Sequence, residues 1–202
     1  MKSNFLTQEY NFDKNAKIII SVGSLIPRKD PETILKAFVQ ADNENLILIF
    51  LGGVALLDAL KRKYNSKNIY FVGHTDAVAE YLNLGDAFVS ASKSEGLPLM
   101  IAEAAACGLH LICTEIPQFT EMLEGFDGKV DRFKVGDHSS LTGIFNERVS
   151  PKKNPSLRYL NKISSERMAD KYIELYKNDT DWFNHQGQLV LDDVISDILF
   201  NY

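Results

Sequence analysis

The stretch KIIISVGSLIPRKDPETILKAFVQADNENLILIFL, residues 17–51, decides the fold of this chain. It contains a short apolar run (17–22), then a helix-length amphipathic segment (31–41), then a second apolar run (46–51). Both runs are apolar throughout rather than alternating, which is typical of parallel strands that are covered on both faces. The stretch therefore predicts a strand, a helix and a second strand parallel to the first.

The same alternation continues along the chain. Further apolar runs lie at 69–73, 86–92, 109–114 and, more weakly, 128–133, and helix-length segments lie at 54–64, 77–83, 98–108 and 118–125. About six strands, each separated from the next by a helix, predict an α/β fold with a doubly wound, Rossmann-like parallel sheet.

Length and composition narrow the class of protein. The chain has 202 residues, of which 45% are hydrophobic and 24% charged, which fits one substantial globular domain. Its net charge of −5 disfavours a nucleic-acid partner, because binding to a phosphate backbone normally needs a basic face. The N-terminus lacks the apolar core of a secretory signal, and no run approaches the roughly 18 apolar residues of a membrane span. We expect a cytoplasmic protein without a transmembrane segment.

Three domain ranges are expected. Residues 1–14 form an N-terminal extension, residues 15–177 the main domain, and residues 178–202 a helical tail that packs on that domain. A basic, proline-containing linker at 148–158 precedes a predicted helix at 164–178, in which Met168, Tyr172 and Leu175 recur at helical spacing. The apolar stripe of the tail favours docking on the main domain over a partner-binding surface.

Several kinds of site are disfavoured. The chain contains no G-x-G-x-x-G, no G-x-x-x-x-G-K-[ST] and no G-x-S-x-G. Its four histidines, at 74, 110, 138 and 185, lack metal-ligand spacing, and Cys107 and Cys113 fit buried reduced thiols better than a metal or redox motif. The triplet Asp179-Thr180-Asp181 resembles a manganese-binding motif of some sugar transferases, but it follows a helix and is expected to be a solvated loop.

In open parallel sheets, ligands bind beyond the carboxyl ends of the strands. The connections to inspect are therefore Gly23 to Asp30, 52–53, 73–76 and Ser90 to Pro98. The first of them carries Arg28 and Lys29, which by themselves are more often solvated than functional. A second anion-binding feature facing the same cleft would favour a functional role for Arg28 and Lys29 over simple solvation.

The fourth connection supplies such a feature. Pro98 suits the first position of a helix, so the unpaired N–H groups of the helix start are expected to point toward the cleft. A helix N-terminus carries a partial positive charge and binds phosphates, and Gly96 allows a ligand to approach the backbone closely.

Glu103 stands inside an otherwise apolar helix, so we expect it to be buried and to need hydrogen-bonding partners. Those partners are either backbone N–H groups of a neighbouring loop or hydroxyls of a ligand, with neither favoured. Glu95 and Glu103 bracket the anion-binding turn. This layout suits a nucleoside diphosphate sugar, which carries phosphates in the middle and hydroxyls at both ends.

At these residues the chain resembles the C-terminal, donor-binding domain of a GT-B glycosyltransferase of the large retaining family 4, the glycosyl transferases of group 1. The resemblance covers about residues 15–177. It rests on Glu95 and Glu103 as the family's E-x7-E motif, and on the segments 22–38 and 71–73. The other matching residues are Ser92, Gly96, Leu97, Pro98, Ala104, Gly108 and Glu121.

The resemblance implies an enzyme of polysaccharide biosynthesis and assigns roles to its residues. Glu95 would bond hydroxyls of the donor sugar and Glu103 those of the ribose, while Lys29 would neutralise the leaving phosphate. The backbone from Gly96 through Leu97 and Pro98 to Leu99 would hold the diphosphate. Gly23, Ser24, Gly73 and His74 would lie around the nucleotide, although His74 is more simply incidental. The resemblance implies no metal and no cofactor beyond the donor, with a UDP-sugar preferred over GDP- or ADP-sugars.

Two departures from the family pattern matter. The family usually has arginine where this chain has Ser24, and Arg28 is a candidate replacement. The N-terminal acceptor domain of GT-B enzymes has no counterpart, so we expect an excised domain, one chain of a two-chain transferase, or a degenerate donor-binding protein. The alternative function is a non-catalytic module that binds a nucleotide sugar or a partner. Attachment to the inner face of the membrane would come through a partner or a lipid-linked acceptor.

Overall fold

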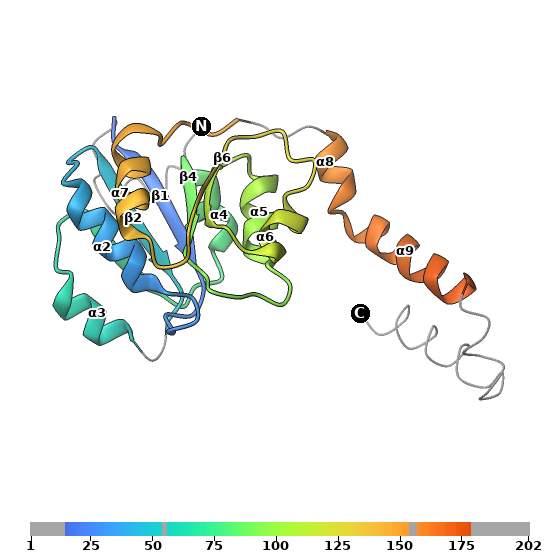
Figure 1. Cartoon of the computed structure of the whole chain (residues 1–202), viewed down its shortest axis with the longest axis horizontal. Coiled ribbons are helices and arrows are strands. Elements are labelled where there is room, and N and C mark those ends of the chain that lie inside the picture. The colour runs from blue at the N-terminus through green and yellow to red at the C-terminus, as the bar shows by residue number, and fades with distance from the viewer. Residues whose placement is uncertain (1–14, 54–55, 154–156, 179–202) are drawn as a thin grey trace. The chain divides into compact units, whose positions relative to one another are not determined.

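The computed structural model describes residues 15–53, 56–153 and 157–178 (Figure 1). Six strands form one parallel sheet with the order β3-β2-β1-β4-β5-β6. The strands are β1 (Lys17–Val22), β2 (Leu46–Leu51), β3 (Ile69–Gly73), β4 (Ala87–Ser90), β5 (His110–Thr114) and β6 (Val130–Phe133). The predicted doubly wound sheet is confirmed.

The helices of the first five crossovers also lie where the sequence pattern predicts them. They are α2 (Pro31–Ala41), α3 (Leu57–Lys63), α4 (Val78–Leu84), α5 (Leu99–Ala106) and α6 (Pro117–Met122). Three more helices follow: α7 (His138–Glu147), α8 (Leu157–Lys162) and α9 (Ser165–Asn178). The predicted helix at 164–178 is therefore present as α9.

Helix α7 was not predicted. It begins after Asp137, whose side chain caps the helix by accepting a hydrogen bond from the backbone N–H of Ser140 at 2.9 Å. Its buried residues include Phe145, whose ring meets that of Phe38 on α2 edge to face, with centroids 6.2 Å apart. Figure 1 shows α2 and α7 side by side. The segment is short and polar at its start, so its sequence alone does not indicate a helix. The packing of its apolar residues on α2 shows why the helix forms.

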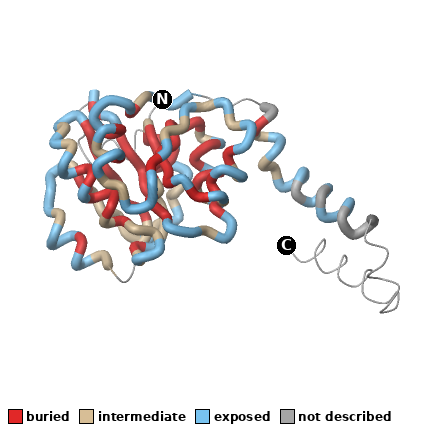
Figure 2. The backbone as a smooth tube through the Cα atoms, viewed as in Figure 1, coloured by how far each residue is buried: buried red, intermediate tan, exposed pale blue. Residues whose placement is uncertain are grey.

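The sheet is covered on both faces, as the unbroken apolar runs predict. Every residue of β2 is buried, and Figure 2 shows the buried residues concentrated along the strands. On one face, Ile19 packs in a cluster with residues of α2 and α7 such as Leu35 and Ile144. Ile20 points to the opposite face, because successive side chains of a strand alternate, and there it lies against Gly85 at the end of α4.

The chain divides into two compact units, residues 1–159 and 160–202. The first unit ends at Tyr159, whose buried ring packs edge to face on Phe126. The N-terminal extension 1–14, the triplet Asp179 to Asp181 and the tail 178–202, apart from Asn178 at the end of α9, lie outside the described residues. Among the helices that the structure describes, none has the length and apolarity that crossing a membrane requires.

Candidate functional site

The strand order creates a crevice at the carboxyl ends of β1 and β4. These two strands are neighbours in the sheet, and the chain leaves them toward opposite sides, which is where open α/β sheets bind ligands. The connection after β1 (23–30) and the connection after β4 (91–98) meet there. The backbone N–H of Lys93 donates to the carbonyl of Arg28 at 2.9 Å, so two segments far apart in the sequence share one wall.

Lys29 and Glu95 form the strongest contact between these connections. The Lys29 ammonium lies 2.6 Å from Oε1 and 2.9 Å from Oε2 of Glu95, and the Glu95 side chain is only 7% exposed. An ammonium group has three N–H donors, so one donor of Lys29 remains for a further acceptor. The fold thus brings together the two residues to which the resemblance assigns catalytic roles, Glu95 at the donor sugar and Lys29 at the leaving phosphate.

Glu95 is held in its ionised form. Burial alone would raise the pKa of its carboxyl, but hydrogen bonds from Lys29 and Ser92, together with the positive charges of Lys29 and Arg28, lower that pKa below its ordinary value. Ser92 is fully buried and its carbonyl accepts a hydrogen bond from the Thr114 hydroxyl at 2.6 Å. The Glu95 carboxylate is therefore held in place at the end of β4 by residues that are themselves buried and hydrogen-bonded.

Arg28 lies against the same turn. Its guanidinium donates to the carbonyl of Ser94 at 2.7 Å and lies 3.3 Å from Glu95 Oε2. Ser24, where the family has arginine, is exposed in the same connection. Arg28 thus brings a second cation to the turn, from four positions further along the chain.

One contact of this wall was not predicted. The Lys93 ammonium lies 3.6 Å from the Asp30 carboxylate, which also accepts a hydrogen bond from the Thr33 hydroxyl at 3.0 Å. Asp30 has a left-handed backbone conformation, with φ of 48°, immediately before α2. The charges of Lys93 and Asp30 are visible in the sequence, but their pairing depends on the adjacency of β1 and β4.

The backbones at the ends of β1, β2 and β3 pack directly on one another. The Gly52 N–H donates to the carbonyl of Gly73 at 2.7 Å, and a Cβ on Gly52 would lie 2.3 Å from the carbonyl oxygen of Gly23. Gly52 also has a φ of 112°, which side-chain-bearing residues rarely adopt. Only glycine fits at position 52, where the backbone packs between Gly73 at the end of β3 and Gly23 beside the crevice.

The start of α5 offers unpaired donors, as predicted. Among the described residues, the backbone N–H groups of Gly96, Leu97 and Met100 have no hydrogen-bond acceptor. The helix begins at Leu99, and Pro98 is its N-cap rather than its first residue, one position later than predicted. The proline still ends the preceding turn, and the donors beside it remain available to an anion.

Glu103 is exposed, so the prediction that it is buried is wrong. Only one side of α5 packs on the sheet, through Ile101, Ala102, Ala104 and Ala105, while Glu103 lies with the 56% exposed Leu99 on the other side. Within the described residues no group bonds the Glu103 carboxylate, and partial desolvation raises its pKa. Apolar composition suggested burial on all sides, but small residues such as Ala106 are tolerated on an open face.

The remaining named residues take less defined positions. His74 is exposed, directly after Gly73 at the end of β3. Cys113 is buried, and burial raises the pKa of its thiol to about 12. Cys107 is only partly buried, which corrects the expectation that both thiols are buried.

The crevice contains little enclosed space. A cavity of about 20 Å³ lies between Gly23, Lys29 and Ser90, whereas a larger cavity of about 390 Å³ lies at the opposite edge of the sheet. Lys29 and Gly23 line the small cavity, and the ion pairs and the unpaired donors belong to the connections after β1 and β4. We assign the candidate site on this chemistry, because a crevice that is open on one side encloses little volume.

Comparison with known proteins places the chain among sugar transferases. The sequence model described as "Glycosyl transferases group 1" matches residues 2–133. N-acetyl-alpha-D-glucosaminyl L-malate synthase of Bacillus anthracis is 26% identical over 180 residues, which are 86% of this chain and 45% of that protein. UDP-Gal:alpha-D-GlcNAc-diphosphoundecaprenol alpha-1,3-galactosyltransferase of Escherichia coli is 27% identical over 81% of this chain and 46% of its own.

Solved structures share the fold. Sucrose-phosphate synthase from Thermosynechococcus elongatus superimposes with a TM-score of 0.70 and 23% identity, over 88% of this chain and 49% of that one. Anabaena HepE in complex with UDP-glucose gives a TM-score of 0.60 and 19% identity, over 70% of this chain and 41% of that one. The fold is that of one Rossmann-like half of a GT-B protein, and the chain spans about half the length of the curated relatives it matches.

Proposed function

The chain belongs to the glycosyl transferases of group 1, and on that premise we propose that it supplies the donor-binding half of a nucleotide-sugar-dependent glycosyltransferase. The observation that carries this proposal is the joining of Lys29 and Glu95 beside the unpaired N–H groups of Gly96, Leu97 and Met100. Cationic and backbone donors suit a diphosphate, and a fixed carboxylate suits sugar hydroxyls.

The proposed chemistry follows from where charge develops. When the bond between the sugar C1 and the diphosphate oxygen breaks, negative charge grows on that oxygen. The third N–H donor of Lys29 and the N-terminus of α5 would stabilise it without a metal ion, while Arg28 lies next to the same turn. Glu95 would accept hydrogen bonds from the donor sugar. By resemblance, transfer would proceed with retention of configuration at C1.

Glu103 is the proposed ribose ligand. It lies about one helical turn after the start of α5, on the side of the helix that does not pack on the sheet. Its lack of a partner in the described part of the chain supports a role for ligand hydroxyls over a structural role. A UDP-sugar is the preferred donor, supported by the UDP-Gal in the name of the Escherichia coli relative.

The acceptor belongs to the other half of a GT-B enzyme. That relative is named for a diphosphoundecaprenol-linked acceptor, and we propose a lipid-linked sugar acceptor in polysaccharide biosynthesis at the inner face of the membrane for this chain also. An acceptor-binding domain or partner chain would complete the active site, because transfer needs both substrates held together. Acceptor-dependent sugar transfer, assayed with and without the product of the neighbouring open reading frame, tests this step.

Calorimetric titration of the chain with UDP, GDP and their sugars tests donor binding. We expect saturable binding of UDP, and Glu103→Ala should weaken it about ten-fold or more, because hydrogen bonds to charged groups contribute about 1.5–3 kcal/mol. Glu147→Ala, at an exposed glutamate that ends α7, is the matched control and should bind as tightly as the wild type. Absence of binding to every nucleotide at millimolar concentration would remove the donor site and leave the non-catalytic interaction module.

A further inference from the structure

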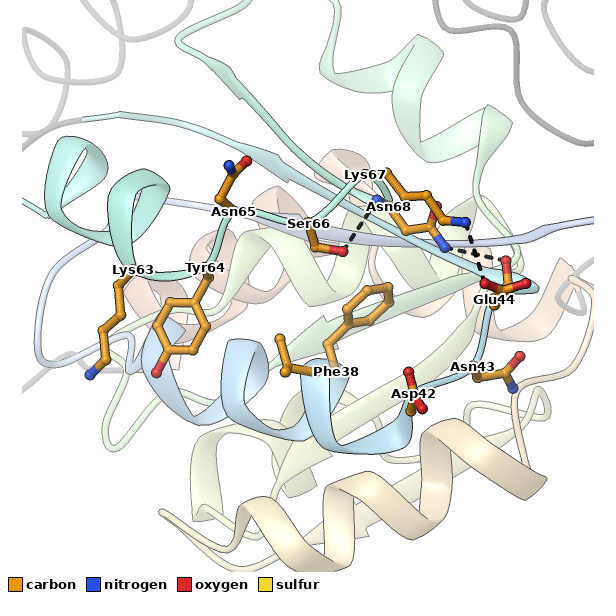
Figure 3. Close-up of a pocket in the computed structure, with 11 residues that line it drawn as sticks. Phe38, Asp42, Asn43, Glu44, Lys63, Tyr64, Asn65, Ser66, Lys67 and Asn68 are labelled. Atoms are coloured by element: carbon orange, nitrogen blue, oxygen red, sulfur yellow. Dashed lines mark hydrogen bonds and ion pairs between the residues drawn. The ribbon is translucent and has the colours of Figure 1, made fainter.

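A cavity lies at the amino edge of the sheet, away from the proposed donor site. It has a volume of about 390 Å³, within the range of small-molecule pockets. Figure 3 shows it between α2 and the turn that leads into β3, and a third wall comes from the turn before β2. No step of the proposed transfer uses this cavity.

Its walls combine rings with amide groups. Phe38 and the half-exposed Val39 contribute an apolar side from α2, and the ring of Tyr64 stands at one end (Figure 3). Three asparagines, Asn43, Asn65 and Asn68, line the opposite sides. An apolar wall facing a few convergent polar groups is the usual pattern of a site for a small organic ligand.

Several of these polar groups have bonding capacity left. Asn43 Oδ1 accepts from the backbone of Asn45, and Asn68 Nδ2 donates to the carbonyl of Glu44. Among the described residues, nothing bonds the amide of Asn65, the amide nitrogen of Asn43 or the amide oxygen of Asn68. Donors and acceptors therefore lie side by side, which matches hydroxyl groups, since each hydroxyl both donates and accepts.

The charge of the cavity selects against ions. Two lysines and two acidic residues line it: Lys63, Lys67, Asp42 and Glu44. Lys67 pairs with Glu44 at 3.3 Å and Lys63 pairs with Glu32, so carboxylates balance the charge of both lysines and the cavity has no net positive charge to attract a phosphate. A neutral ligand is favoured over a nucleotide or a polyanion.

The polar surface extends beyond this cavity. A second cavity of about 300 Å³ shares Asn43 and is lined by three further asparagines, Asn15, Asn45 and Asn146. Six asparagines thus gather at the amino edge of β1, β2 and β3, around two adjoining cavities. Two cavities that share Asn43 suit a chain of sugar units better than a single small molecule.

We propose that the amino edge of the sheet binds a neutral oligosaccharide at a site separate from the donor crevice. The C–H faces of the sugar rings lie against Val39, Phe38 and Tyr64, and the hydroxyl edges bond Asn43, Asn65 and Asn68. Such a site would keep a growing glycan close to the enzyme without taking part in transfer.

Nitrogen-15 NMR titration of the full chain with maltotriose and, separately, triacetylchitotriose tests the site. For at least one trisaccharide we expect saturable shifts of the backbone amides at 63–68, with a dissociation constant on the order of 1 mM. Saturating UDP and the Glu103→Ala variant should leave these shifts unchanged, so the result does not depend on the proposed donor site.

Two variants and a control make the assignment specific. Asn65→Ala should weaken binding about three- to ten-fold, the range of one hydrogen bond, and Val39→Arg should abolish it by filling the cavity from an exposed helix position. Asn161→Ala, at an exposed asparagine of α8, should bind like the wild type. The proposal is overturned if neither trisaccharide gives saturable shifts up to about 20 mM, if the shifts lie at 23–30 and 91–98 instead, or if both variants bind normally.

Discussion

The two edges of the sheet are built from different chemistry. At the carboxyl edge, Lys29, Arg28 and Glu95 are locked in ion pairs over closely packed glycine backbones, and only about 20 Å³ is enclosed. At the amino edge, the walls are amide-rich and balanced in charge around a cavity of about 390 Å³. The larger cavity and the ion-paired residues Lys29, Arg28 and Glu95 therefore lie at opposite edges of the sheet.

This difference follows from how parallel sheets are connected. All six strands end at the same edge, so their carboxyl-end connections converge and can position charged groups against one another. At the amino edge the turns must instead satisfy the first backbone groups of each strand, and asparagine and serine do so through side-chain hydrogen bonds. Cavity volume alone would point to the amino edge, whereas the charged groups proposed for the donor lie at the carboxyl edge.

The variant Gly52→Ala is expected to have the largest effect, and it tests the close backbone packing that distinguishes the carboxyl edge. The new Cβ would collide with the backbone of Gly23 and the φ of 112° would be strained, so we expect a loss of about 4 kcal/mol in the free energy of unfolding. UDP binding should be lost with it, because the collision moves the connection that carries Lys29. Urea denaturation and calorimetry measure the two effects.

The matched control is Gly143→Ala in α7. Nothing lies within 4 Å of a Cβ at this position, and alanine favours a helix over glycine by about 0.5–1 kcal/mol. Gly143→Ala should therefore stabilise the protein slightly. If Gly52→Ala were as stable as the wild type, the close packing of the glycine backbones at the carboxyl edge would be refuted.

The dependence of stability on pH also distinguishes the two edges, because a buried histidine lies at the amino edge. His110, at the amino end of β5, is buried with its Nε2 2.9 Å from Asp131, and its Nδ1 accepts from the Ser150 N–H. Burial, reinforced by the charge of Lys129 and of Lys17, lowers the pKa of His110 to about 4, although Asp131 acts to raise it.

The sign of the effect follows from proton binding. Between pH 6.5 and about 4 the unfolded chain binds a proton at His110 that the folded chain does not, so stability falls as the pH is lowered through this range. The expected loss is about 3 kcal/mol. Urea unfolding at several pH values should show it, and His110→Gln should flatten the curve. The lowered pKa of Glu95 acts only at lower pH, so unchanged stability between pH 7 and 5 would contradict the assignment to His110.

A smaller effect is expected for Lys29→Ala, which removes the cation from the crevice. UDP affinity should fall about ten- to hundred-fold, or about 1.5–3 kcal/mol, the range of hydrogen bonds to charged groups. Lys36→Ala, at an exposed lysine of α2, is the matched control and should bind UDP normally. Equal affinities of the two variants for UDP would remove Lys29 from the donor site.

The roles of the proposed donor-binding residues stay predictions. Their positions in the structure show which features of the site could be predicted from the sequence. Lys29 and Glu95 were named from an anion-binding pattern and a family motif, and the fold brings them within 2.6 Å. Glu103 was named as a ligand residue for the wrong reason, since it is exposed rather than buried. Periodicity indicates that a helix packs on something, but in an alanine-rich helix it does not show which side remains open.

Helix α7 and the Lys93–Asp30 ion pair could not be predicted from the sequence pattern. The apolar positions of α7 become informative only with Phe38 opposite Phe145, and Lys93 meets Asp30 only because β4 lies next to β1. The sequence by itself determined the six strands and the order of helices between them, because the alternation of buried runs is a local property of the chain. The tertiary structure decided which connections share a wall, which side of α5 is open and where the cavities lie, because strand order, and with it every long-range contact, is not written in any local segment.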